Sequence, residues 1–272
     1  MQVSGRKRWK GEEFSSILWG MARLARVVVA GVAHHVAQRG NGPQLLLATD
    51  SERMVYLDLL RQAVRAEGVA VVGYCLMPNH VHLVVIPRRA AALGAALKQT
   101  HGRYAAYWNV AHASRGHAWQ GRFYSCPLDE AHLWQALRYA ELNPVRAKMA
   151  GEAAAWPWSS AGAHCGTGAP DACLDMEAWS RRWSAASWRT FLEEEETQSE
   201  LGALRQCTRT GRPLGSAEFV AALEHRTKRR LAPQKGGRPR KPVAGRRQKE
   251  SRFPKRTRQT ARARRNKRKK RV

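Results

Sequence analysis

Apolar positions follow two different periods in the first third of the chain. Residues 26–38 (RVVVAGVAHHVAQ) are alternating and β-branched, and the turn residues of Arg39 to Gly42 follow them, so a strand is predicted. Residues 51–68 (SERMVYLDLLRQAVRAEG) instead repeat their apolar positions at helical spacing, with Asp50 as the expected cap and Gly68 as the stop. The chain therefore opens with a strand and then a helix.

Two apolar runs come next, and only Pro78 and Asn79 separate them. The runs are residues 69–77 (VAVVGYCLM) and 80–87 (HVHLVVIP), and such a short break favours an antiparallel hairpin. The remaining elements predicted are a helix over 91–110, a short strand over 120–128 and an amphipathic helix from Asp129 or Glu130 to near Pro144. The order β, α, β, β, α, β, α predicts an α+β fold of the ferredoxin-like, split βαβ type, an antiparallel sheet with helices on one face.

The rest of the chain divides by composition into parts with different expected order. We expect a disordered N-terminal extension over 1–20, a folded domain over 21–160, a helical C-terminal region over 161–227 and a disordered basic tail over 228–272. Residues 174–227 are predicted to hold three or four short helices.

Positive charge is concentrated at the C-terminal end. From Arg226 to Val272 there are 23 Lys or Arg and one acidic residue, Glu250, so this stretch carries +22 of the formal net charge of +27. Few large apolar residues accompany the charge, and such a segment stays mobile until an anion orders it. Nucleic acid is the polyanion we expect, because each neutralised phosphate releases counterions.

Cysteine and hydropathy patterns restrict the cellular setting. The five cysteines form no CxxC pair, which fits reduced thiols in a cytosol better than a disulfide framework or a zinc site. No apolar run approaches the roughly 20 residues of a membrane span, and the first residues lack the apolar segment of a secretory signal. A cytoplasmic protein is expected.

Two histidines interrupt the second run of the hairpin. In a strand, His80 and His82 share one face and Val81 points to the other, so the two imidazoles could share a divalent cation. A half-exposed polar strand face explains the same pattern, and a chance His-x-His is common in a chain with ten histidines.

The last predicted helix carries a second pair of polar residues. Tyr139 and Asn143 lie four residues apart and therefore on one face. A phenol can attack phosphorus when a metal ion polarises the phosphate, and an amide oxygen can ligate a hard cation. The alternative is that Tyr139 packs in the core and Asn143 ends the helix before Pro144.

Four ordered blocks resemble one family. The blocks are HHVAQRGN (34–41), GYCLMPNHVHLVV (73–85), WQGRFY (119–124) and YAELNPVRAKM (139–149). Together they resemble the REP-associated tyrosine transposases, which belong to the bacterial single-tyrosine HUH transposases, and the resemblance runs from about residue 22 to residue 160.

The resemblance implies a complete active site. His80 and His82 match the pair that binds Mg²⁺ or Mn²⁺, Asn143 matches the polar third ligand and Tyr139 matches the nucleophile. Residues 21–160 would then be the catalytic domain, and attack by the tyrosine would give a 5′-phosphotyrosine bond and a free 3′-hydroxyl. Tyr104, Tyr107 and Tyr124 are alternative nucleophiles, but none has Asn or Gln four residues later.

Further residues are candidates for contact with DNA. Arg39 and Arg122 flank strands in the matched blocks and are either phosphate contacts or solvated surface arginines. Trp119 and Phe123 either stack on unpaired bases or pack in the core.

The basic tail holds one motif of its own. Residues 235–242 (KGGRPRKP), with Arg238 and Arg240, resemble an AT-hook core that lies in a narrow minor groove. The Arg that usually precedes its Gly is replaced by Gly236, so a non-specific, salt-sensitive anchor for duplex DNA is the alternative.

The sequence thus predicts a metal-dependent single-stranded DNA endonuclease and strand transferase that acts on hairpin-forming REP-like DNA. It would work in the bacterial cytoplasm, associated with the nucleoid, as a monomer or a homodimer. Two other functions fit the same residues: a nucleic-acid-binding regulator that does not cleave, and an RNA-binding protein whose basic tail drives association.

Overall fold

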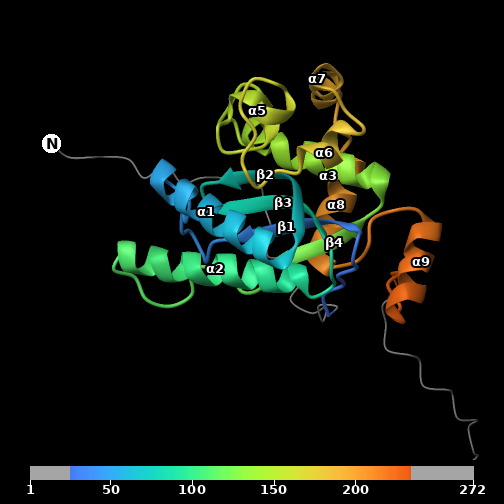
Figure 1. Cartoon of the computed structure of the whole chain (residues 1–272), viewed down its shortest axis with the longest axis horizontal. Coiled ribbons are helices and arrows are strands. Elements are labelled where there is room, and N and C mark those ends of the chain that lie inside the picture. The colour runs from blue at the N-terminus through green and yellow to red at the C-terminus, as the bar shows by residue number, and fades with distance from the viewer. Residues whose placement is uncertain (1–24, 234–272) are drawn as a thin grey trace, which may run out of the picture. The chain divides into compact units, whose positions relative to one another are not determined.

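A four-stranded antiparallel sheet in the order β2-β3-β1-β4 forms the centre of the computed structural model, which describes residues 25–233 (Figure 1). The strands are β1 (Ala33–Arg39), β2 (Val69–Met77), β3 (His80–Pro87) and β4 (Tyr124–Leu128). All three pairings are antiparallel, and β2 and β3 form the predicted hairpin. The strand order and the alternation with helices confirm the α+β, ferredoxin-like prediction.

Helices cover both faces of this sheet. The first four helices are α1 (Asp50–Glu67), α2 (Ala92–Ala111), α3 (Glu130–Glu141) and the short α4 (Asn143–Arg146). The 3-10 turn η1 (Ala153–Ala155) leads to α5 (Ala161–His164), α6 (Met176–Ser180), α7 (Ala185–Glu193), α8 (Gln198–Thr210) and α9 (Ala217–Thr227). Helices α1 and α2 lie on one side, whereas α3 and α6 lie on the other (Figure 1). The prediction that the helices share one face is therefore wrong for α3, because the sheet has apolar side chains on both faces.

The start of α1 differs from the prediction by one residue. Thr49, not Asp50, is the N-cap: its side chain accepts a hydrogen bond from the Glu52 amide, and the Glu52 carboxylate accepts one from the Thr49 amide. This reciprocal capping box satisfies two amides that the first turn leaves unpaired. The helix ends at Gly68, as predicted, with a φ of 70° in the left-handed region that favours glycine.

The first strand is shorter than predicted. Residues 26–32 are not part of β1, because the chain turns at Gly31, whose φ is 73°. Val27, Val29 and Val32 of this segment instead belong to a small buried cluster with Leu223 of α9. Arg226 of α9 and Arg229, just after that helix, donate hydrogen bonds to backbone carbonyls of residues 25–30. These side-chain contacts replace strand pairing for this segment.

Each face of the sheet has its own hydrophobic core. Val81, Leu83 and Val85 of β3 point toward α1 and α2, where they join the larger cluster of buried residues. Val84 of the same strand points the other way, and Leu137 of α3 packs in the cluster on that side. The alternation along one strand therefore supports two layers of helices.

A buried carboxylate connects α3 to the helices that follow residue 160. Glu141 is fully buried and accepts hydrogen bonds from Ser160 Oγ at 2.5 Å and from Trp188 Nε1 at 2.8 Å. His164 Nδ1 lies 2.6 Å from the same carboxylate. The described residues all belong to one compact unit, and the domain boundary at residue 160 stays a prediction.

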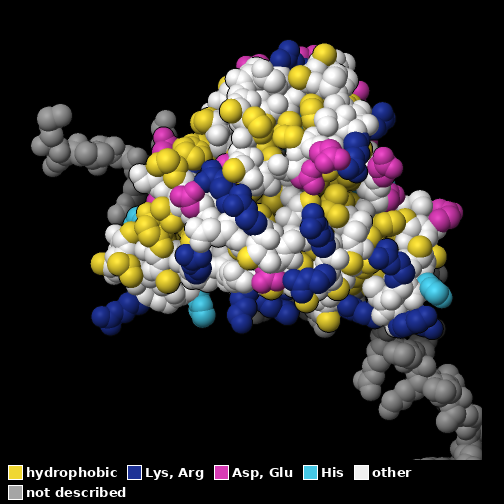
Figure 2. All heavy atoms as spheres, in the orientation of Figure 1, with side chains coloured by type: hydrophobic (Ala, Val, Ile, Leu, Met, Phe, Trp, Pro, Cys, Tyr) yellow, Lys and Arg dark blue, Asp and Glu magenta, His cyan; other side chains and the backbone are white. Residues whose placement is uncertain are grey.

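Charge is unevenly spread over the face seen in Figure 2. Lys and Arg side chains are most frequent along its lower half, and Asp and Glu side chains gather mainly in its upper half. Within residues 25–233, no helix is both long and apolar enough to cross a membrane. The predicted extension over 1–20 and nearly all of the predicted basic tail lie outside the described residues.

The packing of α3 on β2 generates a stability prediction. A Cβ at Gly73 would lie 2.1 Å from Leu137 Cδ1 and 2.7 Å from Ser160 Oγ. Because Leu137 is fully buried and has no room to move, we expect Gly73→Ala to lower the free energy of unfolding by about 1–3 kcal/mol in urea titrations.

The matched control is Gly102→Ala on α2, where an added Cβ meets nothing within 4 Å. This change should raise the free energy of unfolding by about 0.5–1 kcal/mol, because alanine favours helix interiors. Equal stability of Gly73→Ala and the native protein would show that α3 does not pack tightly on β2.

Candidate functional site

The two histidines of β3 lie side by side on the face of the sheet that α3 covers. Their ring centroids are 4.9 Å apart and the rings are nearly perpendicular. His82 is buried, His80 is half-buried, and Val81 between them lies in the opposite core, as the alternation predicts. The hairpin turn at Pro78 and Asn79 sets the position of this pair.

The junction of α3 and α4 brings the second pair of residues to the same place. Tyr139 is buried, and its ring centroid is 5.4 Å from that of His82. Asn143 is also buried, and its side chain makes a hydrogen bond with His80. Leu142 ends α3 and begins α4 with helical dihedrals (φ −81°, ψ −2°), so Tyr139 and Asn143 stay about one turn apart although they lie on different helices.

Burial keeps the imidazoles of the site neutral. The pKa of His80 falls to about 4, chiefly because of burial; the nearby charges of Arg39 and Arg146 lower this pKa as well, and the hydrogen bond with Asn143 opposes these effects. Burial also lowers the pKa of His82 well below its ordinary value, as do His80 and His35 and the charges of Arg146 and Arg205. Neutral rings retain the lone pair that metal coordination requires.

Each ring of the pair has a partner at its Nδ1 atom. His80 Nδ1 lies 2.6 Å from Asn79 Oδ1, to which it donates, because a carbonyl oxygen only accepts. His82 Nδ1 lies 3.0 Å from Nε2 of His35, a β1 residue whose ring stacks on that of His82 at 5.1 Å. The Nε2 atom is therefore the nitrogen that remains for a ligand on both rings.

Two arginines flank the ring of Tyr139. The Arg146 guanidinium lies 4.2 Å from the ring centroid, and Arg146 also donates to the Tyr139 carbonyl. Arg205 of α8 donates through Nε to the Tyr139 hydroxyl at 3.4 Å. Each guanidinium is placed where it could also bind a phosphate beside the phenol.

Sequence reasoning did not identify His35, Arg146 or Arg205 as members of the site. His35 lies inside the matched block HHVAQRGN, and Arg146 lies inside YAELNPVRAKM. Their position in these blocks could have identified both residues as candidates. Arg205 gives no such signal, because it lies in a helix of the segment after residue 160 and reaches Tyr139 only through the tertiary fold.

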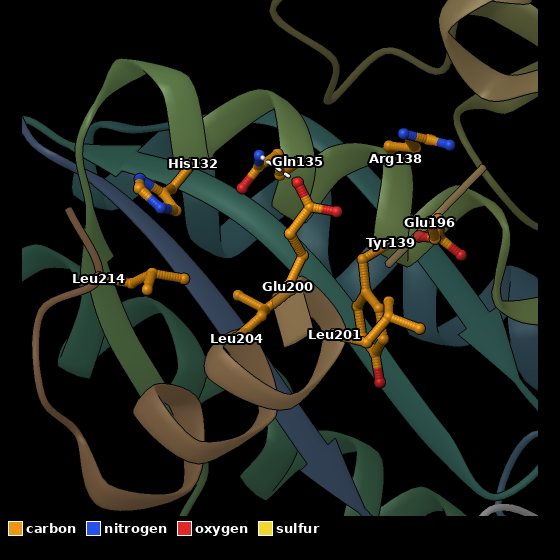
Figure 3. Close-up of a pocket in the computed structure, with 9 residues that line it drawn as sticks. All are labelled: His132, Gln135, Arg138, Tyr139, Glu196, Glu200, Leu201, Leu204 and Leu214. Carbon is orange, nitrogen blue, oxygen red and sulfur yellow. Dashed lines mark hydrogen bonds between the residues drawn. The ribbon is translucent and has the colours of Figure 1, made fainter. Parts of the chain in front are cut away.

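A pocket between α3 and α8 lies next to the nucleophile candidate. Tyr139 lines one end of it, and the pair Gln135 and Glu200, joined by a hydrogen bond of 3.3 Å, spans its middle (Figure 3). The Tyr139 hydroxyl points away from that pair. The pocket thus borders the ring of Tyr139, and no histidine of the β3 pair lines it.

The predicted DNA contacts fall in different places. Arg39, half-buried at the end of β1, pairs across the sheet with His80 and is close enough to influence its pKa. Arg122 is exposed in the segment before β4. Arg238 and Arg240 lie outside the described residues.

Of the two roles considered for Trp119, core packing is the one that the structure shows. Its ring is buried in the core on the α1 and α2 side, where Nε1 donates to the His101 carbonyl at 2.9 Å. Phe123 is partly buried against the same core, and the Arg26 guanidinium lies 3.6 Å from its ring centroid. Among the alternative nucleophiles, Tyr104 is fully buried there and donates to the Leu46 carbonyl.

One family model matches the part of the chain that holds these residues. Residues 34–143 match the family model described as "Transposase IS200 like". No curated protein matches the chain significantly.

Two solved structures are similar over part of the chain. One is described as a REP-associated tyrosine transposase bound to a REP hairpin, with 16% identity and a TM-score of 0.44 over 56% of this chain and 93% of that chain. The other is a putative transposase from Deinococcus radiodurans R1, with 19% identity and a TM-score of 0.31 over 45% of this chain and 98% of that chain.

The buried imidazoles predict how stability depends on pH. Burial lowers the pKa of His34 and His80 to about 4 and of His35 and His101 to about 3, from an ordinary value of 6.5. Between those values the unfolded chain binds more protons than the native protein, so the free energy of unfolding should fall as pH drops below about 6.5. Each imidazole contributes up to about 1.4 kcal/mol per pH unit.

Urea titrations between about pH 7.5 and about pH 5 measure this slope. His101→Gln removes one imidazole outside the candidate site and should flatten the slope by that residue's share. A free energy of unfolding that stays constant over this range would mean that these rings are accessible to protons in the native protein.

Proposed function

We propose, from the match of residues 34–143 to the family model of IS200-like transposases, that the chain is a metal-dependent single-stranded DNA endonuclease and strand transferase. The observation that carries the proposal is the position of a buried phenol, Tyr139, against a neutral imidazole pair and an amide, all on one face of the sheet. A nucleophile that lies next to a candidate cation site is the arrangement that phosphoryl transfer requires.

The residues present fit a divalent cation. Asn79 and His35 contact the Nδ1 atoms of His80 and His82, which leaves Nε2 of each ring for a cation. The Asn143 side chain reaches His80. In residues 25–233 no cluster of three or more His, Cys, Asp or Glu forms a metal site. Two imidazoles and an amide leave positions for water and phosphate oxygens, which suits Mn²⁺ or Mg²⁺. Such a cation, when bound, withdraws charge from the scissile phosphate.

Tyr139 attacks the scissile phosphorus in this proposal. The bond from Tyr139 Oη to phosphorus forms as the bond from phosphorus to the leaving 3′-oxygen breaks, which leaves a 5′-phosphotyrosine and a 3′-hydroxyl. Packing against His35 and His82 restricts the ring to a single orientation. Another 3′-hydroxyl can reverse the step, so strand rejoining needs no external energy source.

The arginines beside Tyr139 stabilise charge in this step. Arg205 at the hydroxyl and Arg146 over the ring are positioned to contact the phosphate that approaches the phenol. Arg39, close to His80, would bind the neighbouring phosphate of the strand.

The substrate class is hairpin-forming, REP-like single-stranded DNA. This part of the proposal is supported by the four sequence blocks that resemble the REP-associated transposases. The Lys and Arg side chains across the lower half of the face in Figure 2 provide a surface for phosphates. The positive charge from Arg226 to Val272 adds non-specific attraction to duplex DNA.

A Tyr139→Phe variant tests the nucleophile. The native protein, incubated with Mg²⁺ and a labelled hairpin oligonucleotide, should form a covalent complex that survives denaturing electrophoresis. Tyr139→Phe should form none, because the ring keeps its packing but loses the attacking oxygen.

The control is Tyr107→Phe, which changes a phenol on the α2 side of the sheet and should leave the covalent complex at the native level. If the native protein binds the hairpin but forms no covalent complex, the chain is a DNA-binding regulator on a transposase fold. Tight competition by RNA at several salt concentrations would instead favour the RNA-binding function.

An Arg205→Gln variant tests the arginine at the phenol. Loss of a charged donor at the reacting centre should reduce the single-turnover cleavage rate by about 10²-fold. Mn²⁺ affinity should not weaken, because Arg205 is not a ligand and its positive charge does not favour a nearby cation. Arg209→Gln, an exposed arginine on the same helix, is the control. A native cleavage rate in Arg205→Gln would exclude a role for this contact in the chemical step.

A further inference from the structure

A chain of buried hydrogen bonds leads from the candidate cation site to α8. His82 Nδ1 and His35 Nε2 are 3.0 Å apart, and His35 Nδ1 and Thr208 Oγ1 are 2.8 Å apart. Thr208 Oγ1 in turn lies 3.3 Å from Cys126 Sγ of β4. All four side chains are buried, with exposed fractions of 4% or less, so water does not compete for these contacts.

The protons on the two imidazoles can be ordered in two ways. A neutral imidazole carries one proton, and each contact between two groups uses one. In the first order, His82 Nδ1–H donates to His35 Nε2 and His35 Nδ1–H donates to Thr208 Oγ1. In the second order, His35 Nε2–H donates to His82 Nδ1 and the Thr208 hydroxyl donates to His35 Nδ1. The contact of Thr208 with Cys126 fits both orders, because either atom can be the donor.

Only the first order leaves His82 able to bind a cation. It places the proton of His82 on Nδ1 and leaves the Nε2 lone pair free. The second order places a proton on Nε2 of His82, and a protonated nitrogen cannot coordinate. The contact between His35 and Thr208 is therefore coupled to whether His82 can be a ligand.

We propose that His35 and Thr208 are positioning residues that hold His82 in the tautomer and orientation for a divalent cation. The inference rests on the proposed function and deepens it, because it assigns a role to the helical segment after residue 160. Parallel stacking of the two rings, at 8° between planes, restrains the orientation of His82, and the hydrogen bonds to its Nδ1 restrain the tautomer.

The position of α8 explains how a distant segment reaches the site. The helix packs on β4 and also contacts β1. Thr208 and Arg205 are three residues apart and share the face of α8 that points to the site. One helix thus contacts both the nucleophile candidate and the partner of the cation ligand.

Asn79 has the matching role for the other ring. It accepts from Nδ1 of His80 and so leaves Nε2 of His80 free. The two imidazoles of the pair are therefore oriented by different partners. His80 is oriented by the hairpin turn beside it. His82 is oriented by the hydrogen bonds through His35 to Thr208 of α8, which we call the relay.

The Mn²⁺ affinity of full-length variants tests the relay. Thr208→Val keeps the side-chain shape but removes the hydroxyl. The first proton order then leaves a buried His35 Nδ1–H without an acceptor, which costs more than the unpaired ring nitrogen of the second order, so the second order is favoured. Isothermal titration with MnCl₂ should show affinity weakened by about 10-fold or more in Thr208→Val and nearly unchanged in Thr208→Ser, which retains the hydroxyl. Thr210→Val is the control, because Thr210 donates only to carbonyls of its own helix.

The tautomer of His82 can also be measured in the native protein, and this test does not depend on whether the Thr208 variants fold. In protein labelled with ¹⁵N-histidine and loaded with Mg²⁺, the His82 ring should carry its proton on Nδ1. A proton on Nε2 of His82 in that state, or native Mn²⁺ affinity in Thr208→Val, would overturn the inference.

The failure of this inference is distinct from the failure of the proposed function. If Thr208→Val weakens Mn²⁺ binding while the native protein forms no covalent complex with DNA, the role of His35 and Thr208 is supported and the nuclease function is wrong. If the native protein forms the complex and Thr208→Val binds Mn²⁺ with native affinity, the function stands and the relay is wrong.

Discussion

The alternation of side chains along β3 is the constraint on which both the core and the candidate site depend. The strand pairs with β2 on one side and β1 on the other, so its register is fixed from both edges. A slip of one residue would move Val81 and Leu83 out of the core and push His80 and His82 into it. Since burial of those apolar side chains stabilises the fold, the same free energy holds the two imidazoles toward α3.

The face opposite α1 and α2 depends on a second constraint, the packing of α3 and of the helices that follow it. Glu141 lies two residues after Tyr139, and its buried carboxylate binds groups from α5, α7 and the preceding loop. The removal of any one of these partners would leave the buried Glu141 carboxylate with a missing hydrogen bond. The segment after residue 160 therefore helps to fix the position of the nucleophile candidate in addition to supplying Arg205 and Thr208.

Local pattern was enough to predict the elements and part of the site. The hairpin, the shared face of His80 and His82, and the spacing of Tyr139 and Asn143 are properties of single elements, which period and turn residues reveal. The stacking of His35 on His82, the approach of Arg205 and the burial of Trp119 depend on packing between elements. The strand predicted over 26–38 was too long for the same reason, since contact with α9 replaces pairing in the sheet.

The central claim is that Tyr139 forms a covalent bond with DNA next to a cation held by His80, His82 and Asn143. Mass spectrometry of the trapped complex tests it most directly, because trypsin cleaves after Arg138 and can release the segment that begins at Tyr139. The account predicts that the nucleotide mass is attached to Tyr139 and that EDTA abolishes the adduct. An adduct on a different residue, or one that forms equally well in EDTA, would contradict it.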